Sequence, residues 1–136
     1  MSPYFLCLLA EALGEADRTE EALSALAEAI DLANEQDNRS LEPEIHRLTG
    51  EMLLRRNGSD VSAAQDCFQR AIDCARVQNA RLPELRAMTS IARLLASQGR
   101  RDEARVMLAE IYNWFTEGFD TADLKDAKAL LDELGH

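Results

Sequence analysis

The sequence predicts an all-α protein, a helical-repeat solenoid of three helix hairpins followed by a C-terminal capping helix. Alanine, leucine, glutamate and arginine dominate the 136 residues, and aromatic residues make up only 5%. These residue types favour helix. The three prolines and six glycines mostly lie near the ends of apolar segments with a helical period. A further observation is an internal repeat, which is typical of solenoids.

Three segments repeat one pattern: an apolar helix, a short polar turn and a second helix with a small residue at a fixed place. The small residues are Ala22, Ala64 and Ala104, which lie 42 and 40 positions apart. Two further sets occupy matching places, small residues on the first helices (Ala10, Gly50, Ala92) and bulky residues on the second helices (Leu26, Phe68, Leu108). Because one hairpin buries only part of its apolar surface, we expect neighbouring hairpins to stack.

Helix start and stop signals divide the chain into hairpins at 3–36, 41–78 and 83–116 and a capping helix at 121–134, within a single domain 1–136. The helices are predicted at 3–14, 20–36, 41–56, 62–78, 83–98, 101–116 and 121–134. The signals, in chain order, are Ser2 before Pro3, Thr19, the pair Ser62 and Gln65, Pro83, Gly99, and Asp120 or Thr121.

The end of the chain combines an aromatic cluster with an amphipathic helix. Tyr112, Trp114, Phe115 and Phe119 are four of the seven aromatic residues of the chain. The helix that follows has one apolar stripe, made of Leu124, Ala127, Leu130, Leu131 and Leu134. A stack of repeats leaves an apolar face open at its end, so a cap with a polar outer side is needed. We therefore interpret the rings as a plug of the core rather than a ligand site, and expect Leu124, Leu130 and Leu131 to pack on the third hairpin.

The repeat pattern resembles the tetratricopeptide repeat family, with small or apolar residues at fixed places in each first helix and Ala, an aromatic or Leu, then Ala in each second helix. A narrower resemblance is carried by "PYFLCLLAEAL", "EIHRLTGEMLL", "AAQDCFQRAIDCAR" and "IYNWFTEGFDTADLKDAKALLDEL". These segments look like the C-terminal helical-repeat tail of large bacterial signalling proteins, in which a nucleotide-cyclase or DNA-binding domain and an AAA-type ATPase domain precede the repeats. The resemblance implies a regulatory protein–protein interaction module, or scaffold.

By the register of that family, the first helix of each hairpin lines a concave groove. The candidate groove residues are Tyr4, Cys7, Glu11, Glu44, Arg47, Glu51, Arg55, Arg86, Thr89 and Arg93. Their mixture of charges suits a protein or peptide segment that carries both signs.

Several function classes are disfavoured by the sequence. The net charge of −10 argues against a nucleic-acid partner. The apolar run from Tyr4 to Ala10 is too short to span a membrane and has no basic residue before it, so we expect a soluble, cytoplasmic protein. No phosphate-binding loop, metal-ligand cluster or nucleophile–histidine pair is present in the sequence, so we expect no catalytic residues, no metal, no cofactor and no enzymatic activity. His46 is interpreted as a packed core residue.

The N-terminal segment also predicts self-association. In "PYFLCLLAEAL" the only charged residue is Glu11, and apolar residues lie all around the helix. We expect a homodimer through helix 3–14 with Tyr4, Phe5 and Leu8 at its centre. Two alternatives to the interaction module therefore stay open, a homo-oligomerisation module and a small-molecule or peptide sensor with its pocket near Trp114.

Overall fold

The structure is a computed structural model, which describes the backbone of residues 2–57, 61–114 and 122–134 and the side chains of 2–56, 61–110 and 125–134. Within these residues it is all-helical. Its helices are α1 (Pro3–Glu15), α2 (Thr19–Glu35), α3 (Glu42–Asn57), α4 (Val61–Val77), α5 (Arg81–Ser97), α6 (Arg101–Trp114) and α7 (Ala122–Leu134). Each predicted helix is present, with its described ends within two residues of the expected positions. The all-α class is thereby confirmed.

The start of α1 follows the predicted capping geometry. The Ser2 hydroxyl oxygen accepts a hydrogen bond from the backbone N–H of Phe5 at 3.1 Å, and Pro3 is the first helical residue. Proline is tolerated there because the first N–H groups of a helix have no partner inside the helix.

Three other predicted start signals are wrong by one or two residues. The N-cap of α2 is Arg18 rather than Thr19, Ser62 lies inside α4, and Pro83 is the third residue of α5. The backbone explains two of these shifts, since the carbonyls of Arg18 and Ala80 already accept the first helical hydrogen bonds, at 3.0 and 3.1 Å. Tertiary packing thus extends each helix past the residue with the best capping side chain.

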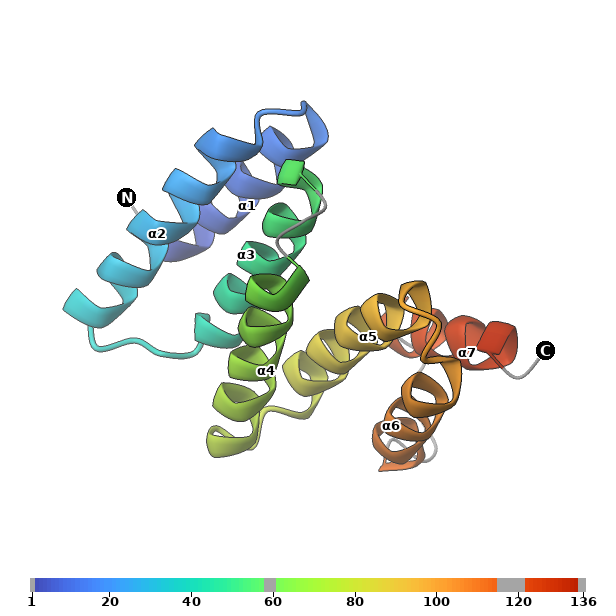
Figure 1. Cartoon of the computed structure of the whole chain (residues 1–136). Helices are drawn as coiled ribbons and strands as arrows, with labels where there is room; N and C mark the ends of the chain where they lie inside the picture. Colours follow the sequence, from blue (N-terminus) through green and yellow to red (C-terminus); the bar gives the residue numbers. More distant parts are fainter. Residues whose placement is uncertain (1, 58–60, 115–121, 135–136) are drawn as a thin grey trace.

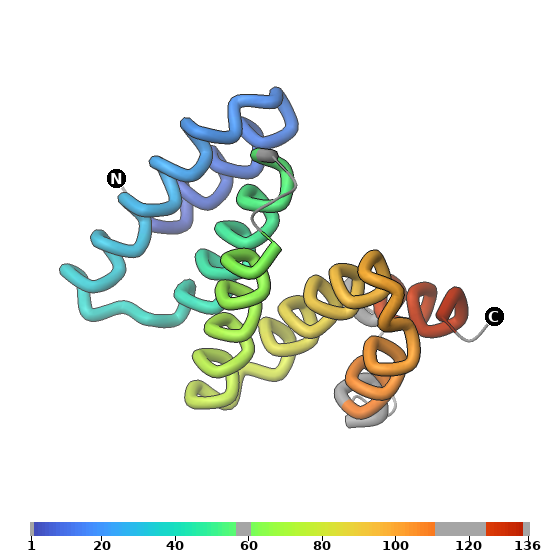
Figure 2. The backbone as a smooth tube through the Cα atoms, in the orientation of Figure 1, coloured from blue at the N-terminus to red at the C-terminus, as the bar shows by residue number. Residues whose placement is uncertain are grey.

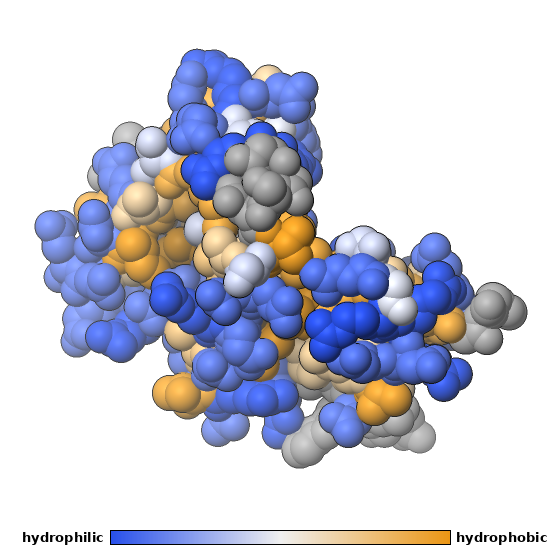
Figure 3. Space-filling model, in the orientation of Figure 1, coloured by the Kyte–Doolittle hydropathy of each residue, from blue (hydrophilic) through white to orange (hydrophobic). Residues whose placement is uncertain are grey.

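Consecutive helices pack as three hairpins, α1 with α2, α3 with α4, and α5 with α6. Contacts between hairpins also join α1 to α3 and α3 to α5, so the first helices form a continuous layer (Figures 1 and 2). The last helix, α7, packs on α5 and α6. The side of the molecule shown in Figure 3 is largely hydrophilic, with apolar residues visible between the charged surfaces of the helices.

The core consists of two clusters that meet at α3. The N-terminal cluster comprises Leu6, Cys7, Ala10, Ala22, Ala25, Leu26, Ala29, Ala33, Ile45, Leu48 and Met52. The C-terminal cluster draws its buried residues from α4, α5, α6 and α7, with Phe68 and Leu108 among those that are fully buried. Ile45, not His46, is the α3 residue at this level of the core, because His46 is only half-buried.

Close approach of α3 and α4 depends on a glycine. A Cβ atom at Gly50 would lie 2.6 Å from Cε1 of Phe68 and 3.1 Å from the carbonyl oxygen of Ala64. The helices therefore pack at a distance that only glycine allows at this position.

The packing of α7 closes the C-terminal end of the stack. Ala127, Leu130 and Leu134 are buried against the third hairpin, and the Arg101 guanidinium donates a hydrogen bond to the carbonyl oxygen of Glu133 at 2.9 Å. Leu131 is only half-buried, so its expected burial was overstated. The described side chains do not include Leu124, Tyr112 or Trp114, and the described residues do not include Phe115, Phe119, Asp120 or Thr121.

Candidate protein-binding groove

Two adjoining hollows lie on the layer of first helices, with volumes of about 320 and 260 Å³. They share Glu11 from α1, Arg47 from α3 and Arg93 from α5. The first hollow adds Glu44, Arg86, Thr89, Ser90 and Asp126, and the second adds Glu15, Leu48, Glu51, Met52 and Arg55. Because three successive first helices contribute to both, we treat them as one surface and call it the groove.

Most of the candidate groove residues lie together on this surface. They are Glu11, Glu44, Arg47, Glu51, Arg55, Arg86, Thr89 and Arg93. Two candidates lie elsewhere. Tyr4 is 60% exposed but does not line either hollow, and Cys7 is buried in the N-terminal core cluster.

Sequence reasoning missed several residues of the groove. Glu15 follows Glu11 by four residues, so a helical period placed on α1 could have found it. Asp126 belongs to α7, which has no counterpart in the repeat, and no periodic signal points to it. Its position follows only from the packing of α7 on α5.

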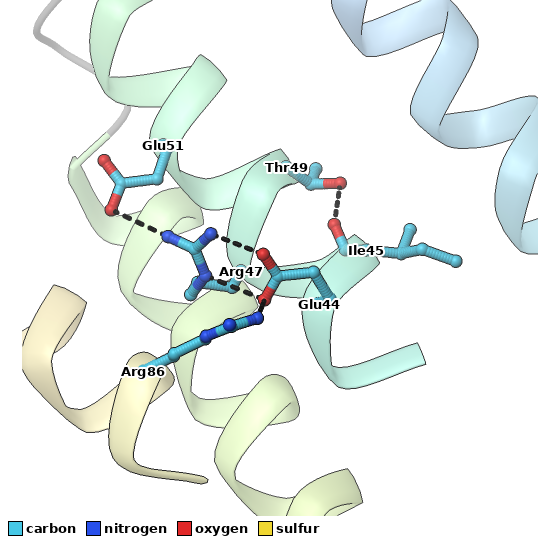
Figure 4. Close-up of polar contacts among 6 residues, drawn as sticks. All are labelled: Glu44, Ile45, Arg47, Thr49, Glu51 and Arg86. Atoms are coloured by element: carbon cyan, nitrogen blue, oxygen red, sulfur yellow. Dashed lines mark hydrogen bonds and ion pairs between the residues drawn. The ribbon is translucent and has the colours of Figure 1, made fainter. Parts of the chain in front are cut away.

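The floor of the groove is an acid–base network on α3. Arg47 donates two hydrogen bonds to the Glu44 carboxylate, with Nε–Oε2 at 3.0 Å and Nη2–Oε1 at 2.5 Å. Glu51 approaches the same guanidinium at 4.0 Å, and the Arg86 guanidinium on α5 reaches Glu44 at 3.9 Å. Figure 4 shows both arginines converging on Glu44. This carboxylate therefore links two hairpins across the groove.

Burial and charge act in opposite directions on Arg47. Burial by itself would lower the pKa of its guanidinium, but the hydrogen bond from Arg47 to Glu44 and the charges of Glu44, Glu51 and Glu11 raise it. The side chains of Arg47 and Glu44 are about one-fifth exposed. A bidentate pair in such a position is stronger and more rigid than a surface ion pair. Arg47 is thus a fixed part of the groove rather than a free charge.

Other charges in the groove have no such partner. Arg55 and Arg93 form no ion pair or hydrogen bond with any residue that the structure describes, and the same holds for Glu11 and Glu15. The two free acids lie on α1 and Arg93 lies on α5, on the opposite side of the α3 floor. The groove therefore has an acidic wall and a basic wall.

Thr89 contributes less than the sequence suggested. It is 5% exposed, and its hydroxyl donates a hydrogen bond to the Leu85 carbonyl at 2.8 Å. Its neighbour Ser90 is likewise buried. A threonine that bonds its own helix in this way satisfies its donor internally. Thr89 therefore belongs to the floor and does not project into the groove.

The thiols and the core histidine are in neutral forms at pH 7. Burial raises the pKa of the Cys7 thiol to about 11, with smaller contributions from the charges of Glu44 and Glu11. Burial lowers the pKa of His46. Cys67 and Cys74 are half-buried rather than buried, and all three cysteines are free. No group that could hold a metal ion is found among the described residues.

A separate hollow lies between α4 and α6, which do not touch within the described part of the chain. Its volume is about 600 Å³, and Ile72, Met88, Val106 and Met107 give it an apolar lining. None of the candidate groove residues takes part in it. The repeat register does not predict this hollow, because it arises from the angle between two hairpins.

The described helices include none that is long and apolar enough to cross a membrane. Comparisons with models of protein families, with curated proteins and with solved structures gave no match for this sequence.

Proposed function

We propose that this chain is a non-catalytic protein–protein interaction module, a tetratricopeptide-like solenoid whose groove binds a segment of a partner protein. One observation carries the proposal. Glu11, Arg47 and Arg93, from three successive first helices, share one continuous hollow surface. A surface built by successive repeats suits an extended or helical segment better than a small compact ligand.

The charges of the groove define the chemistry of that segment. Acidic side chains of the partner pair with Arg93 and Arg55, and basic side chains pair with Glu11 and Glu15, because these four groups have no ion pair among the described residues. The Arg47–Glu44 pair between them is already satisfied and keeps its geometry. The groove thus selects a segment that carries both signs, in one orientation.

The resemblance to tetratricopeptide repeats and to the tails of bacterial signalling proteins supports the same proposal. It places the module in the cytoplasm, at the regulatory end of a larger assembly. A small-molecule sensor with a pocket at Trp114 finds no support in the groove, since that residue does not line either hollow.

Binding of three labelled peptides of equal length tests the proposal. One peptide carries only glutamates, one only lysines, and one a glutamate block followed by a lysine block. We expect fluorescence anisotropy to show the tightest binding for the mixed peptide. Arg93→Glu with Arg55→Glu should weaken that binding by about tenfold or more, since two attractive contacts become repulsive.

The matched control is Arg105→Glu, an exposed arginine of α6 that lies outside the groove. It changes the net charge in the same direction and should leave the affinity within about twofold. Equal losses for Arg93→Glu and Arg105→Glu would show a general charge effect and refute the groove as the binding site.

A further inference from the structure

The outer side of α1 carries a concentration of exposed apolar side chains that no described residue covers. Tyr4, Phe5, Leu8 and Leu9 are 60%, 51%, 47% and 37% exposed. The helical period places Phe5, Leu8 and Ala12 along the centre of this face, at spacings of three and four residues. We call it the α1 face. Spacing of this kind is what one helix uses to pack along another.

The other end of the stack is different. There α7 exposes Lys125, Asp126, Lys128, Asp132 and Glu133 to solvent. A charged end offers no apolar surface to the α1 face of another copy, so head-to-tail stacking of copies is disfavoured. Two α1 faces, by contrast, are complementary to each other, and a contact between identical surfaces closes as a two-fold pair.

The charges along α1 decide the direction of such a pair. Glu15 follows Leu8 by seven residues and so lies on the same line of the helix. In a parallel pair, Glu15 of one copy would face Glu15 of the other, and like charges would repel. In an antiparallel pair centred on Phe5 and Leu8, Glu11 lies near Ser2 of the other copy.

That position is favourable for an acid. The first turn of α1 contains no acidic residue, so the positive end of its helix dipole lacks a negative charge of its own. Glu11 of the other copy supplies one in the antiparallel arrangement. Charge and apolar pattern therefore favour the same direction.

We propose that two copies of this chain pair through their α1 faces, antiparallel, with Phe5 of one copy against Leu8 of the other. The interface is one helix wide and covers a few hundred Å² per copy, less than the ~800 Å² of a standard interface. We therefore expect a dimer that dissociates in the micromolar range. The pairing is independent of the groove, whose unpaired arginines lie on α3 and α5.

Sedimentation velocity over a micromolar to near-millimolar concentration series tests the pair. The unmodified chain should shift from monomer to dimer, and Leu8→Lys should weaken the association by at least about tenfold. The control is Val106→Lys, a substitution of another exposed apolar residue, 56% exposed, in the middle of α6. It should leave the association unchanged, as should Arg93→Glu. Circular dichroism confirms that each variant is folded. A chain that stays monomeric throughout the series, or an equal loss in the Val106 control, overturns the proposal.

Disulfide trapping tests the direction. In a background in which Cys7, Cys67 and Cys74 are replaced by alanine, chains with Phe5→Cys are mixed with chains with Leu8→Cys and oxidised. The antiparallel pair predicts the mixed disulfide as the main product. Predominance of products that join two identical chains would show a parallel pair and overturn the proposed arrangement.

Discussion

At the scale of single residues, four helix ends share one backbone device. Asp17, Asp37, Asn79 and Gly99 follow α1, α2, α4 and α5 with φ angles of 62°, 50°, 56° and 82°. Each left-handed residue lets two backbone N–H groups turn back to helix carbonyls. After α5, for example, Gly99 donates to Ala96 and Arg100 to Leu95, at 3.1 and 2.9 Å. These are Schellman motifs, and only one of the four uses the residue best suited to it.

This predicts opposite effects of two substitutions at equivalent positions. Gly99→Ala should lower the free energy of unfolding by about 1 kcal/mol, because a side chain disfavours the left-handed region. No heavy atom lies within 4 Å of the new Cβ, so the loss is purely conformational. Asp37→Gly should instead raise it, by a few tenths of a kcal/mol to about 1, since glycine relieves that cost while it also loosens the unfolded chain. Urea denaturation measures both changes, and effects of the same sign would contradict this account.

At the scale of helices, two glycines sit at crossings with different neighbours. At Gly50 a Cβ atom would meet the ring of Phe68 and a backbone carbonyl, at 2.6 and 3.1 Å. At Gly14 it would meet the Sδ and Cε atoms of Met52, at 2.7 and 2.6 Å, and a guanidinium nitrogen of Arg55. A methionine end and an arginine tip can move aside, whereas a buried ring and a backbone cannot.

Gly50→Ala should therefore destabilise the protein by roughly 1–3 kcal/mol, because α3 and α4 must separate. Gly14→Ala should be close to neutral or stabilising, since alanine favours helix over glycine by up to about 1 kcal/mol and the flexible neighbours yield. Thermal unfolding of the two variants provides the comparison. If Gly14→Ala proves the more damaging of the two, the helix crossings do not have the geometry described.

At the scale of the whole molecule, stability is organised in two parts that communicate through α3. Within the described residues, α1 and α2 contact each other and α3, but no helix from α4 to α7. Leu26 lies at the centre of the N-terminal cluster and Leu108 in the C-terminal cluster, and both are almost fully buried. In such a chain each hairpin is stabilised mainly by its nearest neighbours.

Hydrogen exchange should reveal this division. Leu26→Ala creates a cavity that costs roughly 2–5 kcal/mol, and should speed amide exchange in α1 and α2 more than in α5 and α6. Leu108→Ala is the same substitution in the other cluster and should give the reverse pattern. Uniform acceleration along the chain by both variants would indicate a single cooperative unit instead.

Sequence by itself determined the number, class and limits of the helices to within two residues, because helix hydrogen bonds and apolar periods are local. It also identified Gly50 and Phe68 as partners at a close crossing, since the repeat aligns them, and it named most residues that line the groove. These residues recur on the first helices, and the repeat period alone brings them to one side.

Only the tertiary structure decided how those residues interact. The link from Arg86 to Glu44 and the presence of Asp126 in the groove depend on how α3, α5 and α7 cross, which no local pattern encodes. The choice of Ile45 over His46 for the core depends on the rotation of α3 about its axis, and a difference of one residue turns that side of the helix by about 100°. Long-range packing sets these rotations and crossings, because it balances the burial of all seven described helices at once.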